Sequence, residues 1–451
     1  MSLIIKNILL IILLVSFCSN SFGQVLELEP YETIWEFKPT DDISSPVTMG
    51  RNGSVFFGAG FKVYRVDGKT GSKIWEFKTN GKILRTPKIG PYSNIYVISE
   101  RFTYWDGDDI SEGNNIIYSL NAETGSKNWE FETTSNFTFV SIGPDGTIFF
   151  GTYDNKVYAV NGLTGESKWD VESVKENSFN YYSLVLRDGT ILVSDKNKAI
   201  ALEASSGSRK WEFSTDEHIT GPVLGFDGTV FIGSRDQHLY ALNPQTGEIN
   251  WKFKTNGPVN KSAAIGLNGL VYVGSSHALY ALDALTGEYR WQFYTSGISP
   301  RPIVGPDGKL YLFDEGVFEE KWLITPKFYA INSNTGQLLW EFEAGHFIYD
   351  PVFDADGTTF LKLIELSPDY HGTMPDSYIL SYVLSKTGMP QGGLNKIRNI
   401  TIGLNGVIYG GGDKLYALEE IFVVADWDGE VILSEKKLLS PIPSNNIAKL
   451  T

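Results

Sequence analysis

The fold of this chain is decided by a repeated stretch, LYALNPQTGEINWKF, at residues 239–253. A second copy, LYALDALTGEYRWQF, occupies residues 279–293. The tryptophan near the end of the repeat recurs as Trp35, Trp75, Trp129, Trp169, Trp211, Trp251, Trp291 and Trp340, at intervals of 40, 54, 40, 42, 40, 40 and 49 residues. A period near 40 residues is typical of a four-stranded β-propeller blade.

Each unit reads as four strands separated by tight turns. An Asp-Gly or Asn-Gly turn, as at Asp227-Gly228, precedes an alternating segment, and a Thr-Gly turn leads into an outer Trp-x-Phe strand. Glycine suits these turns because it tolerates positive φ. No unit shows sustained helical periodicity, so we expect an all-β fold. The repeated tryptophans are predicted to pack between blades, with Trp211, Trp251 and Trp291 buried there.

Counting the turns gives nine inner-strand sets. They fall near Asn52, Ser93, Asp145, Asp188, Asp227, Asn268, Asp307, Asp356 and Asn405. In the eighth set Met389-Pro390-Gln391 replaces the tryptophan strand, and the ninth set lacks an outer strand. Trp35-Glu36-Phe37 could supply that strand and close the ring. The sequence therefore predicts a single propeller of eight or nine four-stranded blades over residues 24–419.

The unit Leu-Tyr-Ala-Leu-Asp-x-x-Thr-Gly-x-x-x-Trp-x-Phe resembles the repeat of the PQQ-binding-like (quinoprotein alcohol dehydrogenase-like) β-propellers, and in particular their BamB-like non-enzymatic branch. The resemblance covers about residues 31–419. For the quinone enzymes of the family it implies eight blades, a vicinal Cys-Cys disulfide over PQQ, and a Ca²⁺ site beside a catalytic aspartate. Cys18 is the one cysteine of this chain. A vicinal disulfide needs two cysteines, so we expect that PQQ is not a cofactor of this chain.

Residues 1–23 are predicted to be a signal peptide. Lys6 gives a positive start, residues 8–15 form an apolar core, and Ser21 and Gly23 are small residues before a cut at Gln24. Lipidation of Cys18 is the alternative. No later segment reaches about 18 consecutive apolar residues, so we expect no transmembrane segment. These features predict an exported protein that is periplasmic, associated with the outer membrane, or secreted.

The net charge of −15 and pI of about 4.9 argue against a nucleic-acid partner, because phosphate binding needs clustered basic residues. Residues 420–451 form a predicted C-terminal extension. Its segment LSPIPSNN, at residues 439–446, resembles the opening of a type IX secretion sorting domain; a disordered tail rich in proline and serine is the alternative.

The chain offers little conventional chemistry. His218, His238, His277, His346 and His371 lack the spacing of zinc ligands, and neither a Gly-x-Ser-x-Gly elbow nor a P-loop is present. The closely spaced carboxylates of Asp106, Asp108, Asp109 and Glu112 suit a hard cation, which makes them candidate Ca²⁺ ligands. A solvated acidic loop explains the same residues.

Three insertions interrupt the repeat, at Ser99–Asn115, Asp314–Pro326 and Glu365–Ser377. Each falls between the second and third strands of its predicted blade, so all three should emerge on one face. They carry the aromatic residues Phe102, Tyr104, Trp105, Phe318, Trp322 and Tyr370. These side chains are candidate anchors for a partner. A local apolar mini-core is the alternative.

These observations favour a non-enzymatic binding or scaffold propeller of the cell envelope or secreted fraction. Its expected partner is an envelope or extracellular protein or a glycan. The alternative is a carbohydrate-active or glycan-binding propeller, and a PQQ-dependent dehydrogenase is less expected. The repeat alone cannot separate these functions, because one fold serves many.

Overall fold

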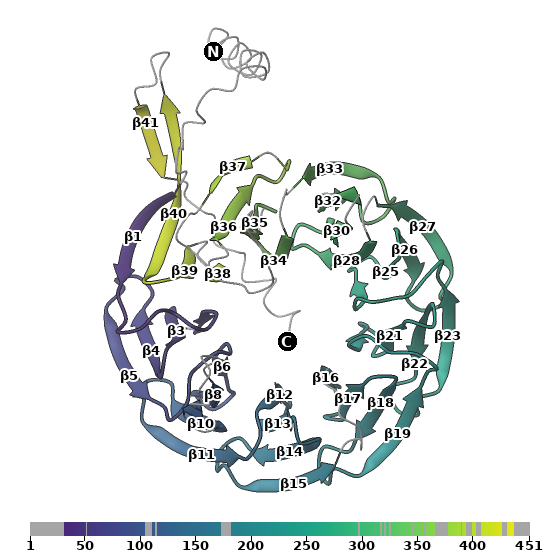
Figure 1. The fold of residues 1–451 in the computed structure, drawn as a ribbon, viewed down its shortest axis with the longest axis horizontal. Helices are drawn as coiled ribbons and strands as arrows, with labels where there is room; N and C mark the ends of the chain where they lie inside the picture. Colours follow the sequence, from purple (N-terminus) through teal and green to yellow (C-terminus); the bar gives the residue numbers. More distant parts are fainter. Residues whose placement is uncertain are drawn as a thin grey trace.

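The structure is a computed structural model, and every regular element of the residues that it describes is a strand. It describes residues 31–50, 52–103, 111–112, 115–172, 182–295, 298–315, 318–319, 322–323, 326–343, 347–354, 357–365, 378–388, 390–393, 399–402, 407–425 and 431–436. Within these ranges nine blades surround a central axis (Figure 1). The predicted all-β propeller is confirmed, and the number of blades is nine.

The first five blades follow one another along the chain, and each runs from an inner to an outer strand. Blade 1 contains β2 (Thr48–Met49), β3 (Ser54–Ala59), β4 (Lys62–Asp67) and β5 (Lys73–Lys78). Blade 2 contains β6 (Lys88–Ile89), β7 (Asn94–Ser99), β10 (Asn115–Asn121) and β11 (Lys127–Thr133). Blade 3 contains β12 (Phe137–Ile142), β13 (Thr147–Thr152), β14 (Lys156–Asn161) and β15 (Ser167–Glu172). Blade 4 contains β16 (Tyr182–Val185), β17 (Ile191–Asp195), β18 (Lys198–Leu202) and β19 (Arg209–Ser214). Blade 5 contains β20 (Val223–Leu224), β21 (Val230–Ser234), β22 (His238–Leu242) and β23 (Ile249–Lys254).

The remaining four blades complete the ring. Blade 6 contains β24 (Ala264–Ile265), β25 (Leu270–Ser275), β26 (Ala278–Asp283) and β27 (Tyr289–Tyr294). Blade 7 contains β28 (Ile298–Val304), β29 (Leu310–Glu315), β32 (Lys327–Ile331) and β33 (Leu338–Glu343). Blade 8 contains β34 (Phe347–Phe353), β35 (Thr359–Glu365), β36 (Tyr378–Leu384) and the short β37 (Pro390–Gly393). Blade 9 contains β38 (Asn399–Ile402), β39 (Ile408–Gly411), β40 (Leu415–Ala425) and, from the other end of the chain, β1 (Tyr31–Phe37).

The ring is closed by the two ends of the repeat region. β1 pairs antiparallel with β40, from Tyr31 opposite Glu420 to Phe37 opposite Leu415. An ion pair of 2.7 Å also joins Glu36 Oε1 of β1 to Nζ of Lys414, the residue directly before β40. The closure predicted for Trp35-Glu36-Phe37 is therefore present, and it gives blade 9 its outer strand.

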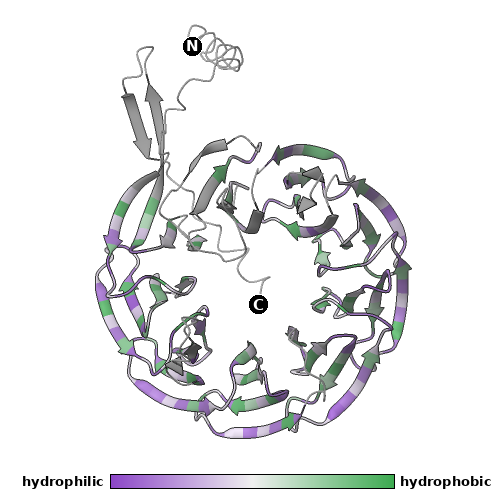
Figure 2. Cartoon of the chain, in the orientation of Figure 1, coloured by the Kyte–Doolittle hydropathy of each residue, from purple (hydrophilic) through white to green (hydrophobic). Residues whose placement is uncertain are grey.

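The strand sequences explain how each blade is layered. The second strands β3, β7 and β13 are buried along their whole length, because neighbouring blades cover both faces. The outer strands β5 and β27 expose alternate residues. Figure 2 shows this as hydrophobic inner strands surrounded by a rim of mostly hydrophilic outer strands. The core is therefore a set of packed layers between blades, as expected for a propeller.

The repeated tryptophans join each blade to the next, in a contact that we call the tryptophan clamp. The indole N–H of an outer strand donates to a carbonyl in the turn between the third and fourth strands of the following blade. The pairs are Trp35 with Gly68 (3.0 Å), Trp75 with Ala122 (3.0 Å), Trp129 with Gly162 (3.0 Å), Trp169 with Ala204 (2.9 Å), Trp211 with Pro244 (2.9 Å), Trp251 with Ala284 (3.3 Å) and Trp340 with Lys386 (3.1 Å). Trp291 occupies the same position, but its Nε1 is buried without a partner in the described part of the chain.

The glycine of the Thr-Gly turn receives the clamp. Gly247 has a φ of +72°, and a Cβ there would lie 2.6 Å from Cε3 of Trp211. A side chain would therefore be strained by the backbone and would also collide with the indole. This requirement explains why Thr-Gly and tryptophan recur together.

Two details of the clamp differ from expectation or from the regular pattern. Trp211 and Trp291 are buried as predicted, but Trp251 is half-buried. Blade 8 carries no tryptophan in β37, so its junction with blade 9 lacks a clamp. That junction is packed by Phe360, Val383, Ile408 and Leu418.

β40 continues beyond blade 9 and pairs with β41 (Val431–Lys436), with Ile421 opposite Lys436. This pair of strands projects away from the ring (Figure 1). The ranges that the structure describes contain no helix long and apolar enough to cross a membrane.

Candidate functional site

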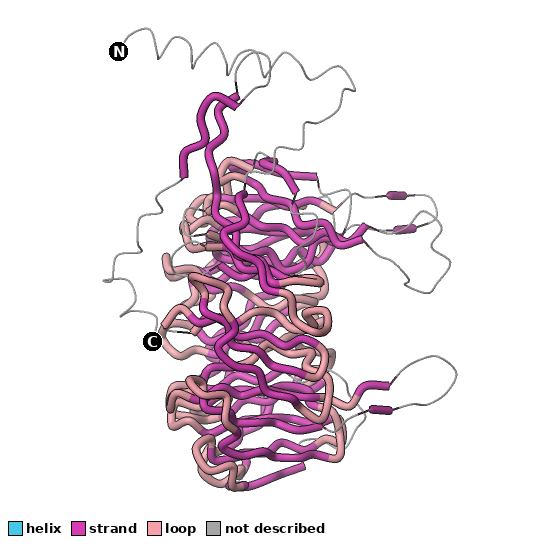
Figure 3. The backbone as a smooth tube through the Cα atoms, turned by 90° about the vertical axis from the view of Figure 1, so that its left-hand side faces the viewer, coloured by secondary structure: helices cyan, strands magenta, loops and turns pink. Residues whose placement is uncertain are grey.

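The two faces of the propeller are built from different connections. The Asp-Gly, Asn-Gly and Thr-Gly turns lie at one end of the strands, which we call the turn face. The connections between second and third strands lie at the other end, which we call the insertion face. Two hairpins project to the same side of the ring, from well-separated blades, and mark the insertion face (Figure 3). They are β8 (Phe102–Thr103) with β9 (Ser111–Glu112), and β30 (Phe318–Glu319) with β31 (Trp322–Leu323).

The blade 2 insertion rises from a base of buried polar groups. Glu100 is buried where β7 ends, and its Oε1 lies 3.0 Å from Nη2 of Arg85. The same oxygen accepts a hydrogen bond from the backbone N–H of Phe137 in blade 3, at 3.3 Å. At the other end of the insertion, Oδ1 of Asn115 accepts from the N–H of Arg101, at 2.9 Å. These bonds fix both ends of the insertion and connect it to the neighbouring blade.

The blade 7 insertion has a comparable base. Asp314 is 1% exposed, and its two carboxylate oxygens are both used. Oδ1 accepts from the N–H of Lys327 at 2.8 Å, and Oδ2 accepts from the hydroxyl of Tyr329 at 3.0 Å. Because Asp314 is the first residue of the insertion and Lys327 follows its last, the carboxylate closes the neck of the loop. A buried carboxylate held this way is costly to leave without its partners.

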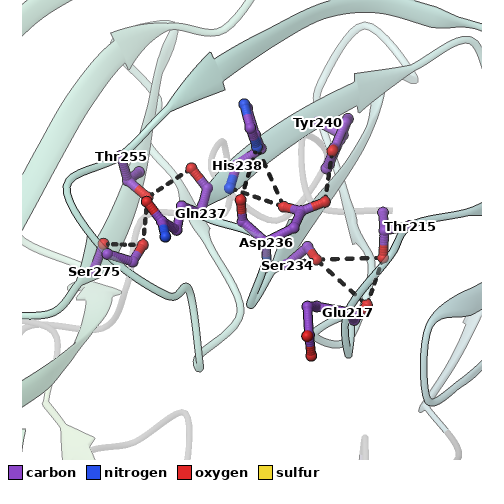
Figure 4. Close-up of polar contacts among 10 residues, drawn as sticks. Thr215, Glu217, Ser234, Asp236, Gln237, His238, Tyr240, Thr255 and Ser275 are labelled. Carbon is purple, nitrogen blue, oxygen red and sulfur yellow. Dashed lines mark hydrogen bonds and ion pairs between the residues drawn. The ribbon is translucent and has the colours of Figure 1, made fainter.

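A third polar group on the insertion face lies in blade 5 (Figure 4). Asp236 Oδ2 accepts from the hydroxyl of Tyr240 at 2.7 Å, and Oδ1 accepts from the backbone N–H of His238 at 3.1 Å. His238 Nδ1 also lies 3.3 Å from Oδ1. Beside them, Ser234 Oγ accepts from the N–H of Asp236 at 3.2 Å and lies 3.3 Å from Oγ1 of Thr215.

This blade 5 network is suited to holding a loop in place. Burial raises the pKa of Tyr240, and its hydrogen bond to Asp236 raises it further, so the phenol stays a neutral donor. The hydroxyl of Ser234 is engaged by Thr215 and by the backbone carbonyl of Glu217. Across the described ranges, no group of three or more His, Cys, Asp or Glu side chains is placed to hold a metal ion.

The sequence-predicted site residues fall into two groups. Four of them lie in the hairpin strands, namely Phe102, Glu112, Phe318 and Trp322. Phe102 is opposite Glu112 in the blade 2 hairpin. In the blade 7 hairpin, Phe318 is opposite Leu323 and Trp322 is opposite Glu319. Tyr104, Trp105, Asp106, Asp108, Asp109 and Tyr370 lie outside the described residues. The candidate Ca²⁺ site and the third insertion therefore remain predictions, and so does the role of the aromatic residues as anchors.

The anchoring carboxylates were not among the predicted residues. Glu100, Asp314 and Asp236 look like ordinary loop residues in the sequence. Their position at the end of a second strand, or one or two residues after it, was the available signal, because a carboxylate there must find partners inside the blade edge.

The chain is similar in sequence and in fold to known propeller proteins. A family model described as outer membrane protein assembly factor BamB matches residues 22–178, 62–218 and 183–311. The chain belongs to this BamB family of PQQ-like propellers. BamB from Moraxella catarrhalis is 16% identical over 86% of this chain and 99% of that chain, with a TM-score of 0.53. The computationally designed Ika8 protein is 11% identical, with the same coverage and a TM-score of 0.50. At these identities the solved structures support the fold, and no curated protein sequence matches the chain.

Proposed function

We propose that this BamB-family chain is an exported, non-enzymatic scaffold that binds a partner protein through its insertion face. The observation that carries the proposal is the pair of hairpins that project from that face on buried polar bases. Loops positioned by a rigid scaffold are common binding elements. The family model is described as an outer membrane protein assembly factor, which supports a scaffold role in the cell envelope. The predicted signal peptide at residues 1–23 supports the same role.

Charge limits the kind of partner. The chain carries a net charge of −15, so long-range attraction favours a cationic or polar protein surface over an anionic one. Glu100 and Asp314 are already satisfied inside the fold. The surface that meets the partner is therefore supplied by the hairpins that these two residues hold in place.

The test shortens the two insertions but keeps their bases. Residues 102–114 and 316–325 are each replaced by an Asn-Gly turn, with Glu100, Asn115 and Asp314 retained. Leu163→Ser, an exposed substitution on the turn face of blade 3, is the control. Pull-downs from the cell envelope should lose their main protein with the shortened chain and keep it with the control. Recovery of the same proteins at the same yield would refute the face assignment.

We also propose that the protein works without PQQ, since Cys18 lies in the predicted signal peptide and leaves no cysteine pair to cover a quinone. After incubation with PQQ and Ca²⁺, gel filtration should separate the quinone from the protein. Stoichiometric quinone absorbance in the protein peak would contradict this.

A further inference from the structure

The turn face carries a second surface feature, which we call the apolar arc. It consists of six exposed apolar residues that lie in the turns of blades 5 to 7 or at the strand starts that follow them: Phe226, Ile249, Leu267, Leu285, Tyr289 and Leu338. Two further exposed apolar residues of these blades, Tyr294 at the other end of β27 and Leu339 next to Leu338, are not part of the arc. Leu267 and Leu285, at 80% and 73% exposure, are the most exposed large apolar side chains of the described chain. Elsewhere such residues are dispersed over other blades, at Ile34, Ile74, Leu84, Tyr92, Tyr153, Leu163 and Tyr182.

Backbone contacts place the turns of the arc side by side. The N–H of Ala284 donates to the carbonyl of Gly269 at 2.9 Å, which joins the turns that hold Leu285 and Leu267. The turn that holds Leu267 also contacts blade 7, because Asn268 Nδ2 donates to the carbonyl of Ser333 in that blade at 3.3 Å. The turns of blades 6 and 7 are therefore neighbours, and the bond from Trp251 to the carbonyl of Ala284 brings the outer strand of blade 5, which contains Ile249, to the same turn.

Because the sequence repeats, three residues of the arc can be compared with the residues at the same position in other blades. Ile249, Tyr289 and Leu338 each lie two residues before a clamp tryptophan. In blades 1, 2 and 4 that position holds Lys73, Lys127 and Arg209, and each forms an ion pair with the glutamate three residues later. Because the fold position is the same, the framework does not require apolar side chains there. Their exposure in three consecutive blades needs another explanation, and contiguous exposed apolar surface typically marks an interaction site.

At the blade 5 end of the arc, the charge after the clamp tryptophan is opposite to that in most other blades. The residue after each clamp tryptophan is acidic in most blades, and a lysine of the adjacent strand holds it, as in Lys62–Glu76 and Lys198–Glu212. In blade 5 this position is Lys252, followed by Lys254 on the same exposed strand. Neither lysine forms an ion pair within the described ranges. The acidic residue of this position is therefore replaced by Lys252, three residues after Ile249, and a second lysine without an ion pair in the described ranges, Lys254, lies at the far end of the same strand.

The edge of blade 6 is also poorly protected against an added chain. Charged side chains on an outer strand discourage pairing with other chains. β27, with the sequence YRWQFY, has a single charged residue, Arg290, and this is already paired with Asp283 at 2.8 Å. Residues 221–295 carry five Lys or Arg and five Asp or Glu, so this sector is neutral in a chain of net charge −15.

We propose that the apolar arc is a docking surface for an extended, acidic and apolar segment of a partner protein. Its apolar side chains contact Ile249, Leu285 and Tyr289, and its carboxylates pair with Lys252 and Lys254. An extended segment fits because the arc follows the rim across three blades. The arc lies on the turn face, opposite the hairpins, so this inference goes beyond the proposed function and does not depend on it.

The test restores the rim pattern of blade 1 in blade 5. Ile249→Lys combined with Lys252→Glu recreates the pair formed by Lys73 and Glu76, so the fold should be retained. Leu163→Lys, on the turn face of blade 3, is the control. The probe is a fluorescein-labelled peptide of twelve residues in which glutamate alternates with leucine and phenylalanine. A second peptide carries lysine in place of glutamate. Binding to the full-length mature chain is measured by fluorescence anisotropy, with circular dichroism as the check on folding.

The acidic peptide should bind the unaltered chain and the Leu163→Lys variant alike, and should bind the double variant at least about tenfold more weakly. Binding should also weaken as salt is added. The proposal is overturned if the acidic peptide does not bind, if the lysine peptide binds equally well, or if the double variant is unchanged. It is also overturned if sedimentation shows a dimer that the double variant abolishes, because the arc would then bind a second copy. Shortening the hairpins should leave all these results unaltered.

Discussion

Replacing single clamp tryptophans by phenylalanine tests the hydrogen bond of the clamp in isolation. Trp211 and Trp291 are 7% and 8% exposed, and each packs against a glycine with positive φ, Gly247 or Gly336. Their indole nitrogens differ. Trp211 Nε1 donates to the carbonyl of Pro244 at 2.9 Å, whereas Trp291 Nε1 is buried and has no partner among the described residues.

Both substitutions remove the same part of the ring, at a cost of about 1–2 kcal/mol for the space left behind. Trp211→Phe also loses a hydrogen bond with a net value of about 1 kcal/mol. Trp291→Phe loses no bond and removes an unpaired buried donor, which relieves about 1–3 kcal/mol. Trp211→Phe should therefore lower the free energy of unfolding by at least about 1 kcal/mol more than Trp291→Phe does.

The assay is equilibrium urea unfolding followed by far-ultraviolet circular dichroism, which does not depend on tryptophan fluorescence. The midpoint should fall clearly for Trp211→Phe and little or not at all for Trp291→Phe. Equal losses, or a larger loss for Trp291→Phe, would refute the assignment of the hydrogen bond as part of the clamp.

Two further predictions concern the turns. Gly247→Ala should destabilise by about 1–3 kcal/mol more than Gly228→Ala in thermal melts, because both have positive φ but a Cβ meets nothing within 4 Å at Gly228; equal melting temperatures would contradict the close contact. The Arg290 guanidinium lowers the pKa of Asp283 from 3.8 to about 2, so the stability that this pair provides is present above about pH 4 and is lost as the pH falls through about 2. Asp283→Asn should flatten the decline in unfolding free energy over that range, and an unaltered pH profile would show that the pair contributes nothing.

Much of the fold could be predicted because the repeat carries its own geometry. The tryptophan of one blade contacts the Thr-Gly turn of the next. Because the two recur together about every 40 residues, the repeat identified the blade. The closing strand could be placed because Trp35-Glu36-Phe37 matches the outer strand that the ninth set lacks. The choice between eight and nine blades needed the structure, since the eighth outer strand, β37, lacks the tryptophan that marks the others.

The candidate site was predicted less completely. The position of the insertions could be predicted from the repeat, because the residues that exceed the repeat length fall between its second and third strands. The anchoring roles of Glu100 and Asp314 could not be predicted, because they depend on partners in another blade or beyond the insertion, such as Phe137 and Tyr329. The apolar arc likewise became visible only when equivalent positions of successive blades could be compared for exposure.

The most direct test of the central claim is site-specific photo-cross-linking in the cells that produce the protein. A photoreactive phenylalanine analogue replaces Phe102 or Phe318 in the two hairpins, or Leu163 on the turn face outside the apolar arc. The proposed function predicts that the positions in both hairpins give the same cross-linked partner protein and that position 163 does not. Adducts of equal yield from position 163, or none from either hairpin, would contradict the proposal that the insertion face binds the partner.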